Sequence, residues 1–334
     1  MRYYDLEIFT LVNSKSTPLA KYTSLIQGNT VNSYRGQTTN PNALNIEFDV
    51  GIAPSSDPTQ NSYVRVHGIP LKDLTQASNF NGAQLRISGG MWKGLPLANY
   101  TQSGVLVAGV ILQAFGNWQG TLQTVDFIVS SSSNYYGEQK NLVLEWRKDK
   151  KLADALRVCL QRAYPDADIQ INISDRLIAS ADLIEVVPNI RALANYIYRI
   201  SKNIIKDVAY NGVAIVFPQT DPNKGNIRVY DNVAYSPPKP RQINFEDLIG
   251  QPTWIRFGTM TFKTVLRADL AVGDYITMPA QASLLQVTTP QSYSQDRQRS
   301  VFEGKFEINN IRHVGNYRMK SADSWVTIIQ ASPR

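Results

Sequence analysis

Cysteine is almost missing from this 334-residue sequence, because Cys159 is the only one. A single cysteine excludes an internal disulfide and any metal site built from several thiolates. Cys159 stands beside Leu156 and Leu160 at helical spacing, where we expect a buried, inert thiol. Only two histidines are present, His67 and His313. They fall in separate β segments, so we expect each to be a structural residue with a satisfied hydrogen bond.

Long apolar runs are also missing. Nowhere do 18 apolar residues follow one another, and the N-terminal stretch MRYYDLEIF has no run of the signal-peptide type. We therefore expect no membrane-spanning segment and a chain that folds in a reducing cytoplasm.

Dense clusters of positive charge are scarce, although the net charge is +7. Residues 1–140 carry about +1, residues 141–236 about +2 and residues 237–334 about +4. The longest basic run, Arg147–Lys151, is interrupted by Asp149. A dispersed excess of this kind is typical of a solvated surface and gives only weak support for nucleic-acid binding.

The sequence lacks the common catalytic and nucleotide-binding motifs. It contains no GxxxxGK[ST], GxGxxG, GxSxG or HExxH. Asp221–Gly225 faintly resembles a calcium loop, but the twelfth position is Asn232 instead of glutamate, so a simple hairpin turn is favoured. No pair of carboxylates is marked out for glycoside hydrolysis. We predict no enzyme and no catalytic, cofactor-binding or metal-ligating residue.

What is present is a β pattern at both ends of the chain. In residues 1–140 apolar and polar residues alternate from Leu44 to Val50, and further short strands are expected at residues 63–66, 85–87, 105–112 and 122–129. In residues 237–334 strands are expected at residues 254–266, 274–278, 284–288, 302–311 and 325–329.

The middle segment, residues 141–236, has a different period. Leu152, Leu156, Cys159 and Leu160 predict a helix that ends at Tyr164. A second helix is expected to open at Pro188 and to continue to Val208, followed by a hairpin of residues 213–217 and 226–230.

The polar run at residues 130–134 and the proline-rich residues 235–240 are the expected boundaries between these parts. The sequence thus predicts a mainly β, α+β protein with domains at 1–140, 141–236 and 237–334.

Aromatic residues are frequent in the two β segments, and they could stack on bases or sugars. In β proteins they more often fill cores or protein–protein interfaces. The residues concerned are Trp92, Trp118, Tyr135, Tyr136, Trp254, Tyr317 and Trp325.

Three stretches together resemble the central hub proteins of contractile phage tails. Residues 64–120 contain GGMWKGLPLA, then a strand, then QAFGNWQG, similar to the first tube-like barrel of such hubs. Val265–Pro279, VLRADLAVGDYITMP, has the L-x-x-GD-x-I turn of hub and spike-base proteins. His313–Ala331, HVGNYRMKSADSWVTIIQA, is similar to the final hairpin of the second barrel. The resemblance covers nearly the whole chain in the same order, and the family has no catalytic residues to transfer.

The resemblance implies two antiparallel, tube-protein-like β-barrels with a smaller α+β domain between them. It also implies a homotrimeric ring with six barrel positions, which adapts the hexameric tail tube, or a tube-initiator protein, to the trimeric central spike of the baseplate. DNA would pass through the lumen without being read. Other baseplate proteins would be further partners, and the expected location is the virion tail, assembled in the host cytoplasm.

Three alternatives remain open at this point. The aromatic residues and the pI of 9.3 are compatible with a nucleic-acid-binding β-barrel. Some hubs carry a lysozyme-like insertion, which here would have to occupy the middle segment. The base of a related contractile injection or secretion spike is a near equivalent, although no spike segment follows the second β segment. Arg297, Arg299 and Arg312 could line either a pore or a subunit contact.

Overall fold

The computed structural model describes residues 2–12, 15–25, 40–54, 61–91, 100–130, 140–207, 210–217, 226–234, 239–256, 258–279 and 302–334. Several sequence expectations concern residues outside these ranges. They are the boundary after Ser130, the turn at 221–225, most of the proline-rich linker and the strand at 284–288.

Strands dominate the fold. They are β1 (Arg2–Val12), β2 (Lys15–Thr23), β3 (Ile46–Ile52), β4 (Asn61–His67), β5 (Gln84–Met91), β6 (Gly104–Gln119), β7 (Leu122–Ser130), β8 (Leu142–Trp146), β9 (Asp168–Asn172), β10 (Leu183–Val187), β11 (Ala214–Val216), β12 (Asn226–Tyr230), β13 (Arg241–Gln242), β14 (Thr253–Arg256), β15 (Thr259–Val265), β16 (Tyr275–Thr277), β17 (Phe306–Asn316) and β18 (Trp325–Pro333). The helices are α1 (Leu71–Thr75), α2 (Leu152–Ala163) and α3 (Ile190–Ile204), with 3₁₀ turns η2 (Ala77–Phe80), η3 (Tyr100–Gln102), η4 (Phe245–Asp247) and η6 (Ala322–Ser324).

The chain divides into two compact units. Unit 1 comprises Met1–Ile52, Gln60–Ser131 and Pro238–Arg334, and unit 2 comprises Ala53–Thr59 and Ser132–Pro237. Unit 1 holds the large antiparallel sheet, and unit 2 holds α2, α3 and two small sheets. The mainly β class with a smaller α+β part, expected from the sequence, is confirmed.

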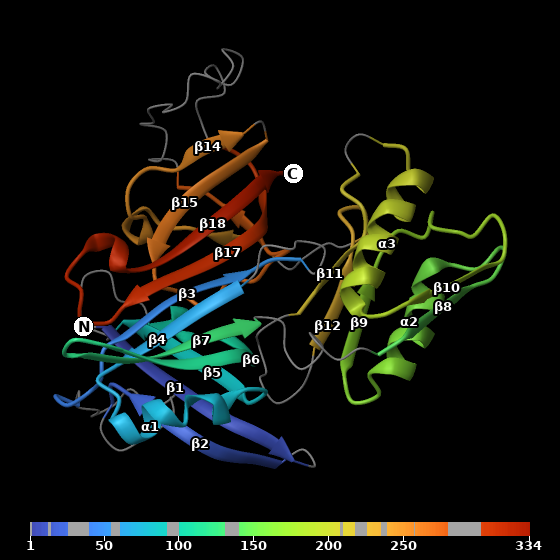
Figure 1. The fold of residues 1–334 in the computed structure, drawn as a ribbon. Coiled ribbons are helices and arrows are strands. Elements are labelled where there is room, and N and C mark those ends of the chain that lie inside the picture. Colours follow the sequence, from blue (N-terminus) through green and yellow to red (C-terminus); the bar gives the residue numbers. More distant parts are fainter. Residues whose placement is uncertain are drawn as a thin grey trace. The chain divides into compact units, whose positions relative to one another are not determined.

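One sheet of unit 1 is built from both ends of the chain. Its strand order is β14-β15-β18-β17-β3-β4-β7-β6-β5-β1-β2. The two β segments meet where β17 pairs antiparallel with β3, from Ile311 opposite Ile52 to Asn316 opposite Glu47 (Figure 1). Segments more than 250 residues apart in sequence therefore share one hydrogen-bonded sheet.

The C-terminal strands pair with one another in series. Strand β15 pairs with β18, β18 with β17 and β17 with β16. The segment that contains β13 begins against β16 and ends against β15, where Ile249 N donates to Lys263 O at 2.9 Å. A backbone hydrogen bond and an isolated bridge thus link this segment to β15. Ile243, Phe262 and Ile276 are buried among these strands.

The N-terminal strands surround a second core. Alternate residues of β1, β3, β4, β5, β6 and β7 face it, because side chains alternate between the two faces of a strand. Leu74 of α1 and Ala77 of η2 cover one part of this core. Trp325 of β18 belongs to the same cluster and packs edge-on against Phe48 at 5.3 Å, so the cores of the two β segments are continuous.

Unit 2 has its own core. Leu156 and Leu160 of α2 and Leu193 and Ile197 of α3 pack with strands β8, β11 and β12. The hairpin of β11 and β12 is present as expected, and β9 joins it in parallel to β12. The β8–β10 sheet was not expected from the sequence.

Both predicted helices are present, with one difference in position. Helix α2 ends at Ala163, directly before Tyr164, as predicted. Helix α3 begins at Ile190 and not at Pro188, because the Asn189 side chain caps it by accepting a hydrogen bond from Ala192 N at 2.9 Å. It ends at Ile204, earlier than expected.

The expected strand at residues 254–266 is in fact a hairpin. Strands β14 and β15 pair antiparallel and turn at Gly258, whose φ of +66° suits glycine. The alternating pattern of β1, with Tyr4, Leu6 and Ile8 buried, was present in the sequence but was not among the strands predicted from it.

A substitution tests the join between the two β segments. Gly315 lies opposite Phe48, and a Cβ at Gly315 would lie 2.1 Å from Phe48 Cζ. Because overpacking forces side chains and backbone to move, Gly315→Ala should lower the free energy of unfolding by about 1–3 kcal/mol, measured by urea denaturation. Gly51→Ala is the matched control, since a Cβ at Gly51 would have no atom within 4 Å. Equal losses in both variants would contradict this account of the join.

Candidate functional site: the junction and faces of the large sheet

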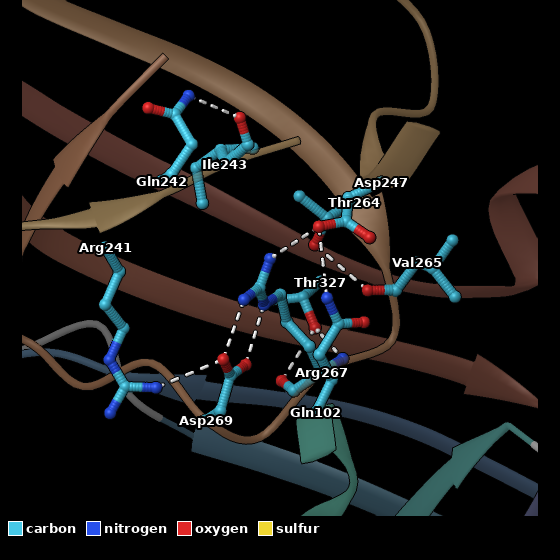
Figure 2. Close-up of polar contacts among 10 residues, drawn as sticks. All are labelled: Gln102, Arg241, Gln242, Ile243, Asp247, Thr264, Val265, Arg267, Asp269 and Thr327. Atoms are coloured by element: carbon cyan, nitrogen blue, oxygen red, sulfur yellow. Dashed lines mark hydrogen bonds and ion pairs between the residues drawn. The ribbon is translucent and has the colours of Figure 1, made fainter. Parts of the chain in front are cut away.

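A buried arginine lies close to the junction of the two β segments. Arg267, just after β15, is only 4% exposed. Its Nη1 donates to Asp247 Oδ2 at 3.3 Å, and its Nε and Nη2 donate to the two carboxylate oxygens of Asp269 at 2.7 Å each (Figure 2). Arg241 Nη1 also donates to Asp269 Oδ2 at 3.2 Å. Both carboxylates are therefore engaged with arginine, an arrangement suited to holding structure in place.

The same network extends to the first β segment. Gln102 Nε2, from η3, donates to Asp247 Oδ2 at 3.0 Å, and the Gln102 carbonyl accepts from Ala268 N at 2.7 Å. Figure 2 shows Gln102 and Asp247 converging beside Arg267. These contacts join residues far apart in sequence within a buried site, where an unpaired polar group would be costly.

A buried histidine adjoins this network. His313 Nδ1 lies 2.9 Å from Thr327 Oγ1, and Thr327 Oγ1 also bonds to the backbone of Arg267. The Thr327 hydroxyl donates to the Arg267 carbonyl, so the neutral imidazole that fits here carries its proton on Nδ1. Burial lowers the pKa of His313 to about 3. The expectation of a structural His313 with a satisfied hydrogen bond is confirmed.

The sheet face opposite the N-terminal core carries matched charges. Arg65 of β4 makes a two-pronged contact with Asp126 of β7, with Nε–Oδ1 at 2.6 Å and Nη2–Oδ2 at 2.9 Å. Arg312 of β17 pairs with Asp49 of β3 across the junction, with Nε–Oδ1 at 2.6 Å. Arg312 therefore forms a contact between the two β segments, whereas Arg297 and Arg299 lie outside the described residues.

The matched charges continue across β1, β2 and β5. Lys21 Nζ lies 2.8 Å from Glu7 Oε1 and 3.1 Å from Asp5 Oδ2, and Arg86 pairs with the other oxygen of Glu7. We call the face that bears Lys21, Arg65, Arg86 and Arg312 the paired-charge face. Each of these four cations is compensated by a carboxylate on an adjacent strand, so the face offers little free positive charge despite the net charge of the chain.

The β6–β7 hairpin presents exposed apolar residues. Trp118 is 62% exposed near the turn, and Leu112, Phe115 and Leu122 are exposed as well. The Trp118 Nε1 donates to Gly120 O at 2.8 Å, which fixes the indole against the turn.

The other predicted aromatic residues have varied positions. Trp325 is buried, and Tyr317 packs edge-on against Tyr4 at 5.0 Å. Trp254 stacks on Phe302 with ring centroids 5.1 Å apart. Trp92, Tyr135 and Tyr136 lie outside the described residues.

The remaining chemical candidates have structural roles. Cys159 is buried, and burial raises its thiol pKa to about 11, which disfavours the reactive thiolate. His67 Nε2 lies 3.2 Å from Glu47 Oε1 on the large sheet, but this buried atom makes no hydrogen bond within the described part of the chain, so the satisfied hydrogen bond expected for His67 is not found. Among the described residues no three His, Cys, Asp or Glu side chains gather as metal ligands would. The described helices include none long and apolar enough to cross a membrane.

Several carboxylates of unit 2, where a hydrolase would have to lie, have partners. Surface ion pairs join Lys151 to Asp175 at 2.8 Å and Arg147 to Asp182 at 3.3 Å. The buried Asp231 was not singled out in the sequence. It accepts hydrogen bonds from Ser174 N at 2.7 Å and from Tyr210 Oη at 3.1 Å.

Comparisons with known proteins give structural neighbours only. No family model matches the chain, and no curated protein matches it in sequence. One neighbour is an E. coli component of the type VI secretion system, described as structurally similar to the T4 phage tail proteins gp27 and gp5. The match covers 90% of this chain and 76% of that chain, with 11% sequence identity and a TM-score of 0.49.

Two tail proteins match over a similar extent. A tail protein from Neisseria meningitidis MC58 matches 98% of this chain and 96% of its own, with 8% identity and a TM-score of 0.49. A 43 kDa tail protein of prophage MuSo2 from Shewanella oneidensis matches 100% and 97%, with 6% identity and a TM-score of 0.46. These neighbours are described as tail proteins or as a component of a secretion system. At such identities the likeness concerns the fold and not the chemistry.

The buried arginine gives a stability prediction. Arg267→Met leaves Asp247 buried without its cation, so we expect the free energy of unfolding to fall by about 3–5 kcal/mol. Lys263→Met is the matched control, because Lys263 pairs with Asp323 at the surface, where such a pair contributes about 0–1 kcal/mol. Urea denaturation of both variants measures the difference, and similar losses would show that burial of the Arg267 network does not matter.

The buried histidine gives a pH prediction. The unfolded chain binds a proton at His313 near pH 6.5, whereas the folded chain does so only near pH 3. Stability from this group is therefore complete above pH 6.5 and is lost as pH falls toward 3, by up to about 1.4 kcal/mol per pH unit. His313→Asn keeps a polar atom near Thr327 and removes the titration. The stability difference between wild type and variant should shrink between pH 6.5 and 4, and a constant difference would refute the assignment.

Proposed function

We propose that the chain is a non-catalytic structural hub of a phage-tail baseplate. In this role it forms a homotrimeric, pseudo-sixfold adaptor between a hexameric tail tube and a trimeric central spike. The observation that carries the proposal is the antiparallel join of β17 to β3, which places two β segments side by side in one sheet. A chain with two such segments supplies six in a closed trimer, the number that a hexameric tube needs.

The division into two tube-like barrels at 1–140 and 237–334, with 141–236 between them, is part of this proposal. It is supported by the serial pairing of β15, β18, β17, β16 and β13. The N-terminal strands surround a single core, which suits a second barrel. The two do not contribute separate sheets, because they share the β17–β3 pairing.

We propose that the paired-charge face lines the lumen of the ring. A surface that DNA passes without binding should carry few uncompensated cations, because nonspecific affinity for DNA comes from neutralised phosphates. Ion pairs such as Arg65–Asp126 and Arg312–Asp49 meet this requirement.

Contacts between subunits and to other rings would use the free edge and the apolar hairpin. Strand β2 ends the strand order of the sheet, and an edge strand offers backbone groups to a neighbouring chain. The exposed Trp118 and Leu122 would contact the tube, a tube-initiator protein, the spike or another baseplate protein. The proposed location is the tail baseplate of a virion, assembled in the host cytoplasm, and the base of a related injection or secretion spike has the same architecture.

The mass of the purified protein in solution tests the trimer. We expect about 112 kDa, three times the 37.4 kDa of one chain, by light scattering at high protein concentration. Negative-stain images should show a threefold ring with a central hole. A monomer at every concentration would contradict the proposal.

The nucleic-acid alternative rests on the exposed Trp118 and the net charge of +7. It predicts that the protein binds short single strands in low salt, with affinity that falls steeply as salt rises. A flat titration near about 50 mM salt would leave the hub as the better account.

A further inference from the structure

A groove at one end of unit 1 has no role in the contacts described so far. It has a volume of about 530 Å³ and is lined by Arg2, Asn40, Pro41, Met91, Tyr317, Arg318, Met319 and Lys320. Its walls come from β1, from the end of β5, from the residues before β3 and from the loop between β17 and η6. It is thus formed by both β segments of the large sheet.

The charge of the groove is one-sided. Arg2, Arg318 and Lys320 line it, and none of the described residues that line it is acidic. None of these three cations is paired with a carboxylate among the described residues, in contrast to the four cations of the paired-charge face. The groove is therefore a local positive site on a sheet whose other charges are largely matched.

Two of the three cations are held in place by backbone carbonyls. Arg2 donates to Asn316 O at 2.9 Å and to Ser321 O at 2.9 Å, with its guanidinium 5.7 Å from the Trp325 ring centroid. Arg318 Nη2 donates to Ala43 O at 2.6 Å. Carbonyl oxygens fix these groups without neutralising them, so little conformational entropy is lost when an anion binds.

The rest of the groove is apolar and adaptable. Met319 is 56% exposed, and Met91 and Pro41 also line the groove. Methionine side chains are flexible and polarisable, and surfaces rich in them accommodate varied apolar side chains of a partner. The Tyr317 ring packs in T-shaped contacts with the Tyr4 and Trp325 rings, with centroids 5.0 and 6.3 Å apart.

We propose that this groove binds an acidic segment of a partner protein, in which carboxylates alternate with apolar side chains. Its carboxylates would contact Arg2, Arg318 and Lys320, and its apolar side chains would contact Met91 and Met319. The sequence stretches that adjoin the lining residues, 26–39 and 92–99, contain no Asp or Glu, so they cannot supply these anions. The inference goes beyond the proposed hub role and does not depend on trimer formation.

Fluorescence anisotropy with the purified full chain tests the proposal. The ligand is a fluorescein-labelled peptide, Glu-Asp-Leu-Glu-Asp-Leu-Glu-Asp, and its control has Gln and Asn in place of Glu and Asp. The acidic peptide should bind about tenfold more tightly than the control in about 50 mM salt, and the advantage should shrink in about 300 mM salt because exposed charges are screened.

Variants locate the binding. Lys320→Glu should lower the affinity for the acidic peptide about fivefold to tenfold, because it reverses one charge. Met319→Ala should lower this affinity about threefold, because it removes an apolar contact. Both side chains are exposed, so the fold should persist. Lys72→Glu is the matched control, since Lys72 is exposed on α1 and does not line the groove; it should change affinity less than twofold.

Three results would overturn the proposal. They are equal binding of the acidic and neutral peptides, equal effects of Lys320→Glu and Lys72→Glu, and displacement of the peptide by oligothymidylate at lower concentration than by unlabelled acidic peptide. Because solution mass tests the trimer separately, failure here leaves the hub proposal standing, and the reverse also holds.

Discussion

The backbone pairing of β17 with β3 is the interaction on which unit 1 depends. It converts two β segments separated by Ser132–Pro237 into one sheet, and it brings their cores into contact through Trp325 and Phe48. The register admits only a very small residue at Gly315, because the Phe48 ring occupies the position of a side chain there. Bringing together segments so far apart in sequence costs conformational entropy. Burial on one face of the join and ion pairing on the other must offset this cost.

Two different kinds of polar interaction secure this join. On the core side, Arg267 holds two carboxylates and is linked to Gln102 of the other segment. On the opposite face, Arg312 reaches Asp49 in water. The buried network is costly to break because its members cannot be solvated, whereas the surface pairs mainly remove free charge. One side of the sheet therefore gives stability, and the other carries surface charges that are matched in pairs.

The two surfaces differ in the groups that their cations contact. Cations on the paired-charge face lie beside carboxylates, and those of the groove contact carbonyl oxygens instead. Both surfaces belong to one chain with a positive net charge, so composition alone could not distinguish them. The difference lies in which strand supplies the neighbour of each arginine.

The sequence by itself determined the local structure. The alternating pattern predicted β3, β4, β5 and β7, and helical spacing predicted α2 to its last residue. The buried Cys159 and the hydrogen-bonded His313 were also expected, whereas the bond expected for His67 is missing among the residues that the structure describes. Such signals depend on neighbours within a few residues, so they survive without knowledge of the fold. The start of α3 was misplaced because Asn189, not the preceding proline, makes the cap.

Only the tertiary structure decided what the two β ends do together. No local pattern predicts that Gly315 lies opposite Phe48. Nor does one predict that Arg267 pairs with both Asp247 and Asp269, or that Arg2 lies beside residues 317–320. Each of these contacts joins residues distant in sequence, and strand register and burial fix them only when the whole sheet forms. The chemistry of the surfaces is therefore a property of the assembled sheet, because a side chain's neighbours, and not its identity, decide whether its charge is free.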